Sequence, residues 1–297
     1  MIFINYYDEI KNELVNNEIT KKVKDYSKNR SDLTTYYNVG KLLFEAGKHY
    51  GEGIIKEYSK RLTNEFGTKF GITLLKRIRQ FYIVIEKGAT MSHQLSWSHY
   101  CELLPVNSID KINYYIKITK EQNLSIRELR TKIKNNEYER LDESTKEKLK
   151  EKEELKVPDL VKNPIQIKNT SGNNEISEKV LQKLILEDIP SFLDELGNGF
   201  TFVRNEYKIK IGDRYNYIDL LLFNYEFNCF VVVELKVTEL RKEHIGQIEF
   251  YMNYIDKNLK NINQNKTIGI IICKKENNYI IEYCSDDRIL AREYELI

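Results

Sequence analysis

The spacing of apolar residues changes once along this chain of 297 residues, and that change most constrains its fold. Over residues 1–155, apolar positions recur every three or four residues, as in IIKEYSKRLTNEF, which is typical of amphipathic helices. Over residues 176–297, they alternate with polar residues or form short runs, as in CFVVVELK, which is typical of strands. The intervening residues 156–175 contain two of the four prolines and a polar Ser-Gly-Asn-Asn run. The sequence therefore predicts a helical domain, a linker and an α/β domain over these three ranges.

The order of elements in the α/β domain follows from the same patterns. We expect a helix that ends near Gly197, then three strands, a second helix, a fourth strand and a fifth. The expected strands cover 200–212, 215–224, 229–236, 267–275 and 279–285, and the second helix covers 244–260. The predicted fold class is α+β with two domains.

Charge is divided unevenly between the two halves, although the net charge is only +2. Residues 1–140 contain 24 Lys and Arg against 17 Asp and Glu, whereas residues 176–297 contain 16 against 20. A basic first half suits contact with a polyanion. An acidic second half suits a site built from carboxylates.

Neither a targeting signal nor a disulfide framework is expected. No stretch is apolar for long enough to span a bilayer, and the N-terminal residues lack the basic and apolar regions of a signal peptide. The four cysteines are scattered, without the short spacing of a zinc or redox motif. These features predict a cytoplasmic protein with reduced thiols and no membrane partner.

Charged residues follow a strongly apolar strand at VVVELK, where a buried position is costly for an unpaired charge. Glu234 and Lys236 are two residues apart in a strand, so they point to the same face while Leu235 points to the other. Asp219 lies in the preceding expected strand, and the connection between the two is short enough for a hairpin. We therefore expect the three charged side chains to converge on one face of a sheet.

Such a convergence can bind a hard cation. The carboxylates of Asp219 and Glu234, with the carbonyl oxygen of Leu235, form the all-oxygen ligand set that Mg²⁺ prefers, and Mn²⁺ is an alternative. Lys236 could then orient an attacking water or stabilise charge on a phosphate. The bare pattern favours another explanation, a partly buried salt-bridge cluster or charges at strand ends in water, because so short a motif often occurs by chance.

A basic face is expected on the helix TLLKRIRQFYIVIE. Lys76, Arg77 and Arg79 lie beside Tyr82, whereas the other side of the helix is apolar. A basic face with an aromatic residue fits the backbone of a nucleic acid. A solvated amphipathic helix explains the same pattern.

The order of the elements, with an Asp followed after fourteen residues by Glu-Leu-Lys, resembles the PD-(D/E)XK nuclease superfamily. Nearly the whole chain outside 141–175 is similar to the YhcG-like family of bacterial PD-(D/E)XK proteins. The matching stretches include YYNVGKLLFEAGKHYGEGIIKEYSKRLTNEFGTKF, LLKRIRQFY, QLSWSHY, IRELRTKIKNNEYERL, LDELGNGFTFVRNEYKI, YIDLLLFN, CFVVVELK, GQIEFYMNYID and IGIIICK. The resemblance implies a helical, winged-helix-like N-terminal domain followed by a restriction-endonuclease-like α/β domain with a mixed central sheet.

The resemblance also assigns roles to residues. It implies that Asp219 and Glu234 are metal ligands, that Lys236 is the catalytic lysine, and that Gln247 faces the active site from the following helix. Independently of it, Gln247 and Tyr251 share one helical face, because they are four residues apart. The chain departs from the superfamily pattern at Ile218, the position of the proline in the name PD-(D/E)XK. It also has Glu206 where the family often has glutamine.

An acidic residue on the first helix of the α/β domain assists some members of the superfamily. Glu187 and Glu195 are the candidates here, although a surface position is the simpler expectation for both.

The function predicted from sequence is a Mg²⁺-dependent phosphodiesterase, an endodeoxyribonuclease whose helical domain binds DNA and whose second domain cuts it. The alternatives are a non-catalytic DNA-binding or scaffold protein on a nuclease fold, and a nuclease specific for branched DNA or RNA. A homodimer would provide the two sites that cutting both strands of a duplex requires.

Overall fold

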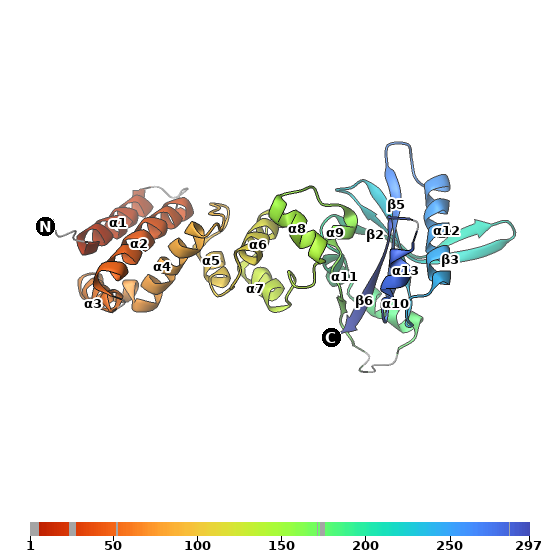
Figure 1. The fold of residues 1–297 in the computed structure, drawn as a ribbon. Coiled ribbons are helices and arrows are strands. Elements are labelled where there is room, and N and C mark those ends of the chain that lie inside the picture. Colours follow the sequence, from red (N-terminus) through yellow and green to blue (C-terminus); the bar gives the residue numbers. More distant parts are fainter. Residues whose placement is uncertain (1–5, 24–27, 52, 171, 173–175, 285) are drawn as a thin grey trace. The chain divides into compact units, whose positions relative to one another are not determined.

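The computed structural model describes residues 6–23, 28–51, 53–170, 172, 176–284 and 286–297. The chain divides into two compact units, Met1–Tyr138 and Glu139–Ile297, which are described separately (Figure 1). Within the first unit, the described residues form helices and no strand, so the winged-helix detail of the prediction is not confirmed. These helices are α1 (Tyr6–Val23), α2 (Lys28–Tyr50), α3 (Ile54–Phe66), the short 3-10 helix η2 (Thr68–Phe70), α4 (Ile72–Glu86), α5 (Trp97–Leu103), α6 (Ile109–Glu121) and α7 (Ile126–Lys134).

The helices of the first unit pack through the apolar faces that the sequence predicts. In α3, Ile55, Tyr58 and Leu62 recur at helical spacing and are buried. Helices α2 and α4 approach each other closely at Gly40, where an added Cβ would lie 2.5 Å from the carbonyl oxygen of Ile78. Only glycine allows that approach.

The second unit is built on a mixed sheet of six strands in the order β1-β6-β5-β4-β3-β2. β2, β3 and β4 pair antiparallel, and β4, β5, β6 and β1 pair parallel, as the predicted fold class requires. The strands are β1 (Ile165–Ile167), β2 (Phe200–Ile211), β3 (Arg214–Asn224), β4 (Cys229–Leu235), β5 (Asn265–Cys273) and β6 (Ile289–Leu296). The helices are α8 (Glu143–Glu151), α9 (Val157–Leu160), α10 (Glu178–Glu187), α11 (Ile189–Leu196), α12 (Lys242–Asn258) and α13 (Asn278–Glu282).

Helices cover both faces of this sheet, so the central strands are apolar on both sides. On one face, α10 and α11 bury Leu181 and Phe192 against Leu220, Val231 and Val233. On the other face, a second core joins strand residues to α12, and its members include Leu221, Val232, Ile248, Met252 and Ile255. The run VVV in β4 therefore alternates between two cores.

The structure corrects the predicted linker over 156–175. Residues 165–167 form β1, which pairs with β6 in parallel, and α8 and α9 also belong to the second unit. The unit therefore begins at Glu139 rather than after 175. A strand of three residues is too short to produce an alternating pattern, which is why the sequence did not reveal it. Residues 171 and 173–175 of the predicted linker lie outside the described residues.

Two further predictions differ from the structure. The helix expected up to Gly197 is two helices, because Asp188 caps a new helix through a bond from the Ser191 N–H and Pro190 lies in its first turn. The strand expected over 279–285 is wrong: α13 covers most of that segment, and the last strand lies at 289–296. β5 and β6 are parallel, so the chain between them must cross over the sheet.

Candidate active site

Asp219 and Glu234 lie side by side because of the pairing between β3 and β4. Leu220 pairs with Val233, and the two carboxylates come one residue beyond that pair on each strand. The side chain of Glu234 is buried, with the residue only 1% exposed, whereas Asp219 is half-buried. The convergence predicted for Asp219, Glu234 and Lys236 is present in the structure, as the contacts of each residue demonstrate.

Hydrogen bonds hold the cluster in place. Oδ2 of Asp219 accepts the backbone N–H of Leu235 at 2.8 Å, which ties the carboxylate to the neighbouring strand. Nζ of Lys236 donates to Oε2 of Glu234 at 3.0 Å. Nε2 of Gln182, on α10, donates to the backbone carbonyl of Asp219 at 3.1 Å.

The backbone changes direction at Asp219. In β3, Ile218 packs into the core of α12 while Leu220 packs into the core of α10, although residues two apart should share a face. Glu206, in the matching position of β2, has a φ of +46°, a conformation that few side chains adopt. This irregularity lets the Asp219 carboxylate turn toward the N–H of Leu235 instead of entering either core.

The sequence did not identify Glu178, which contributes a third carboxylate near the cluster. Its Oε2 lies 3.9 Å from Nζ of Lys236, at the first residue of α10. The helical pattern offered a signal, because Glu178 is three residues before the buried Leu181 and shares its side of the helix, although Glu178 itself is exposed.

The two acidic residues named as candidates from the sequence lie elsewhere, and the surface position expected for Glu195 is wrong. Glu187 is on the other end of α10, where it accepts a hydrogen bond from Thr170 at 2.7 Å. Glu195 is buried and forms an ion pair with Arg140. Neither contacts the cluster.

Burial and the charges of their neighbours shift the pKa values of Glu234, Asp219 and Lys236. Burial, together with the Asp219 carboxylate, raises the pKa of Glu234 to about 7. Burial also raises the pKa of Asp219, although the Leu235 N–H and Lys236 oppose the rise. For Lys236, burial lowers the pKa, but the adjacent Glu234 carboxylate outweighs it and the pKa ends above its ordinary value. The lysine is therefore held as an ammonium ion between carboxylates.

Helix α12 places Gln247 and Tyr251 beside one another. Nε2 of Gln247 donates to the Tyr251 hydroxyl at 3.2 Å, in agreement with the spacing of four residues. Burial raises the pKa of Tyr251, the hydrogen bond from Gln247 lowers it, and the nearby Glu234 and Asp219 carboxylates raise it further. Tyr251 therefore lies close enough to the cluster for their charges to interact.

The residues predicted to contact nucleic acid lie on α4 of the first unit. Lys76 and Arg77 are exposed and Arg79 is half-buried. Tyr82 is not on that surface: it is buried, and its ring packs 5.3 Å from Tyr37 between centroids. The tyrosine is part of the α2–α4 packing because the helix turns it toward Gly40, which has no side chain.

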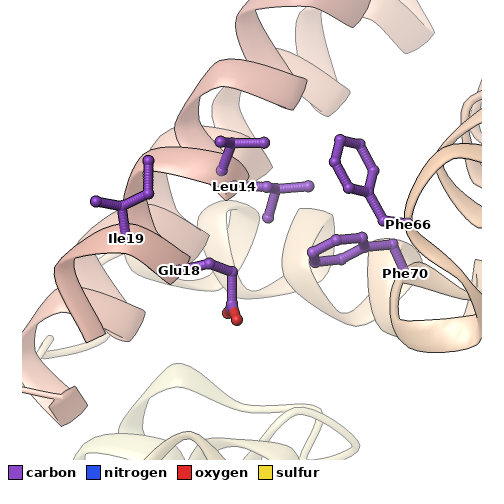
Figure 2. Close-up of a pocket in the computed structure, with 6 residues that line it drawn as sticks. Leu14, Glu18, Ile19, Phe66 and Phe70 are labelled. Atoms are coloured by element: carbon purple, nitrogen blue, oxygen red, sulfur yellow. The ribbon is translucent and has the colours of Figure 1, made fainter. Parts of the chain in front are cut away.

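An apolar pocket also lies in the first unit, between α1 and the end of α3 (Figure 2). Its volume is about 210 Å³, and Leu14, Ile19, Phe66 and Phe70 line it. Glu18 is the ionisable side chain there, and it pairs with Lys69. The pocket therefore lacks the convergent polar groups of a catalytic site.

The described residues contain no group of three or more His, Cys, Asp or Glu side chains arranged to hold a metal ion. The cluster instead offers two neighbouring carboxylates and main-chain oxygen. Oε1 of Glu234 is buried and makes no hydrogen bond to any described residue. A buried carboxylate oxygen without a partner is costly, so the position fits a cation that would neutralise it.

In the part of the chain that the structure describes, every helix is too short or too polar to cross a bilayer.

Two family models and one relative match most of the chain. Residues 158–297 match the family model of the YhcG PDDEXK nuclease domain, and residues 9–140 match that of the DUF1016 N-terminal domain. The chain is 26% identical to YhcG of Escherichia coli (strain K12), which is named as a candidate nuclease. That similarity covers 95% of this chain and 88% of the relative.

Similarity to solved structures is weaker. A repair endonuclease from Pyrococcus abyssi has a TM-score of 0.29 at 18% identity, over 43% of this chain and 49% of that one. The EndoMS–dsDNA2 complex has the same TM-score and identity, over 43% of this chain and 48% of that one. This chain therefore spans about half of those chains, at a TM-score too low to establish a shared fold. The family models and the relative of similar length do identify the protein: it belongs to the YhcG-like family, with a PDDEXK nuclease domain over residues 158–297.

Proposed function

We propose that this protein is a divalent-metal-dependent nuclease that hydrolyses phosphodiester bonds within DNA, at the cluster of Asp219, Glu234 and Lys236. The buried Oε1 of Glu234 carries this proposal, because it has no partner among the described residues and lies beside a second carboxylate. A structural salt bridge alone would leave no reason to bury that oxygen unpaired. The family match supports the same chemistry.

The side chains fit a hard cation such as Mg²⁺ or Mn²⁺. Glu234, Asp219 and the carbonyl of Leu235 would hold the ion, since all three offer oxygen. When bound, it would neutralise charge that develops on the phosphate. The raised pKa values of Glu234 and Asp219 favour this assignment, because a cation makes both carboxylates easier to ionise.

Lys236 has the properties of an electrostatic group rather than a base. Its pKa is above the ordinary value, so it remains protonated at neutral pH. Its ammonium can therefore stabilise the phosphate or orient water through hydrogen-bond donation. Gln247 and Tyr251 would add a polar contact from α12 that aligns the substrate. Lys76, Arg77 and Arg79 would hold the DNA backbone from the first unit.

The proposal is tested by cleavage of plasmid, linear, branched and single-stranded DNA and of RNA, in Mg²⁺, Mn²⁺ or EDTA. We expect cleavage of DNA in the metals and none in EDTA. The Glu234→Ala and Lys236→Ala variants should each reduce the rate at least about 100-fold, as expected for removal of a group that stabilises the transition state.

Matched controls are Glu282→Ala and Lys274→Ala, which remove exposed charges of the same types from the second unit. Both should cleave like the original protein. Activity that survives Glu234→Ala and Lys236→Ala would refute the site. Tight DNA binding without cleavage in any metal would favour the non-catalytic alternative.

A further inference from the structure

The β2–β3 hairpin continues beyond the rest of the sheet (Figure 1). β4 pairs only with residues 220–224 of β3, so 205–211 and 214–219 extend as a two-stranded ribbon. A tight turn at Gly212, whose φ is +57°, joins the two strands. The ribbon therefore begins at the position of Asp219.

One face of the ribbon is anchored. Ile209 and Ile218 are fully buried in the core of α12, and Tyr207 and Ile211 pack against the same core. Because side chains alternate along a strand, residues 208, 210, 215 and 217 point away from α12. The ribbon is thus held in a defined position while its opposite face remains free to bind.

The opposite face consists of tyrosines and lysines. Lys208 pairs with Tyr217 across the strands, and Lys210 pairs with Tyr215. Tyr215 is 53% exposed and Tyr217 is 51% exposed. Nζ of Lys208 lies 3.7 Å from the centre of the Tyr215 ring. We call the surface formed by Lys208, Lys210, Tyr215 and Tyr217 the tyrosine–lysine ribbon.

Its charged groups are available for a partner. Beyond the backbone pairing of the two strands, the side chains of Lys210, Arg214 and Tyr217 form no hydrogen bond, ion pair or ring contact within the described part of the chain. Residues 203–217 contain four basic and two acidic residues, whereas the region 176–297 as a whole is acidic. The ribbon is therefore a basic, aromatic surface on an acidic domain, which is complementary to a nucleic acid.

The ribbon also leads directly from the candidate site. Tyr217 and Tyr215 precede Asp219 by two and four residues in the same strand, or about 7 and 13 Å at the usual rise per residue. Rings spaced along a strand can stack on successive unpaired bases, and lysines between them can contact phosphates. In a duplex, the base faces are already stacked on one another and are not available to these rings.

We propose that the tyrosine–lysine ribbon binds an unpaired DNA strand as it enters the site, so that the substrate is DNA with a single-stranded segment. This inference rests on the proposed nuclease function, because it assigns the ribbon to the substrate of that reaction. The ribbon distinguishes unpaired from paired DNA, whereas basic residues elsewhere contact the backbone of either.

The test compares two probes: a short blunt duplex, and the same duplex with a single-stranded overhang. Dissociation constants of the full-length protein are measured by fluorescence anisotropy in EDTA, where cleavage does not interfere. The double variant Tyr215→Ala/Tyr217→Ala should bind the overhang at least about tenfold more weakly, as loss of base stacking implies, with no change on the blunt duplex. Tyr215→Phe/Tyr217→Phe should retain binding, because the rings remain.

The lysines are tested by salt dependence. Lys208→Gln/Lys210→Gln should make the dependence of overhang affinity on salt shallower by about 1.4 in the log–log slope, since it removes two contacts to single-stranded phosphates. The matched control Tyr225→Ala/Lys257→Ala removes an exposed tyrosine and an exposed lysine outside the ribbon and should bind both probes normally.

Equal binding of both probes by the original protein would overturn the inference. So would an equal loss on both probes in Tyr215→Ala/Tyr217→Ala, which would indicate that the ribbon contacts a duplex groove. Unchanged binding in that variant, in a protein that cleaves DNA, would refute the binding role of the ribbon but not the proposed nuclease function. Overhang binding that depends on the ribbon, in a protein that cleaves nothing, would refute the nuclease function but not the binding role.

Discussion

At the scale of single residues, Glu178 changes how the site is understood. Its carboxylate lies 3.9 Å from the Lys236 ammonium, which also lies 3.0 Å from the carboxylate of Glu234. A lysine between two carboxylates has fewer rotamers available than one with a single partner. We infer that Glu178 positions Lys236 and does not itself contact the substrate.

The prediction for Glu178→Gln follows from that position. The variant keeps the shape of the side chain and removes its charge, so the lysine is less firmly held. We expect kcat to fall roughly 10-fold, as is typical when a group behind the reacting residues is lost, with KM nearly unchanged. Steady-state cleavage kinetics of this variant and of Glu282→Gln would check it. A rise in KM alone would contradict a positioning role.

The residues of the cluster show what the sequence can and cannot reveal. Asp219, Glu234 and Lys236 were identified because strand alternation and a short hairpin determine their proximity. Glu178 was not, because its contact with Lys236 joins a helix to the residue after a strand, more than fifty positions away, which no local pattern specifies. Tyr82 was assigned to the wrong surface, because amphipathic spacing does not distinguish an aromatic residue at the edge of a helical face from one in the core.

At the scale of elements, the sequence predicted those with a long regular pattern. β2, β3, β4, α12 and β5 all lie within a few residues of their expected ranges. The segment 279–285 is β-branched and aromatic, and it was expected to be a strand for that reason. In the structure it belongs to the crossover between β5 and β6, where Tyr279 and Tyr283 are 76% and 81% exposed. Topology outweighs propensity there.

The close packing between α2 and α4 can be tested by comparing two glycine-to-alanine substitutions, one in α2 and one in α12. Gly40→Ala would place a methyl group 2.5 Å from the Ile78 carbonyl oxygen, a backbone atom that cannot move freely. We expect it to lower the free energy of unfolding by about 1–3 kcal/mol. Gly246→Ala, in α12, meets no atom within 4 Å and should raise that energy by up to about 1 kcal/mol. Urea unfolding measures both, and a shift of the same sign in the two variants would contradict the packing argument.

At the scale of the whole molecule, the boundary between the units has physical causes. Arg140 forms a buried ion pair with Glu195 and donates to the carbonyl of Pro164 at 2.9 Å. Glu195 in turn accepts the N–H of Gln166, in β1, at 2.9 Å. Arg292 bonds to the carbonyl of Val161 at 3.1 Å. Prolines and polar residues made 156–175 resemble a linker, but these contacts make its first part a component of the second unit.

Two fragments test that boundary. A fragment of residues 139–297 contains all of these contacts and should unfold cooperatively, with a melting transition of its own. A fragment of residues 176–297, which begins where the sequence placed the domain, lacks Arg140 and β1. It leaves Glu195 buried without its cation, at a cost of about 3–5 kcal/mol, and exposes the edge of β6. We expect it to aggregate or to melt without cooperativity. The substitution Glu195→Gln in the longer fragment separates the two losses, because it removes the charge and retains β1. If 176–297 proved as stable as 139–297, residues 139–175 would be a linker after all.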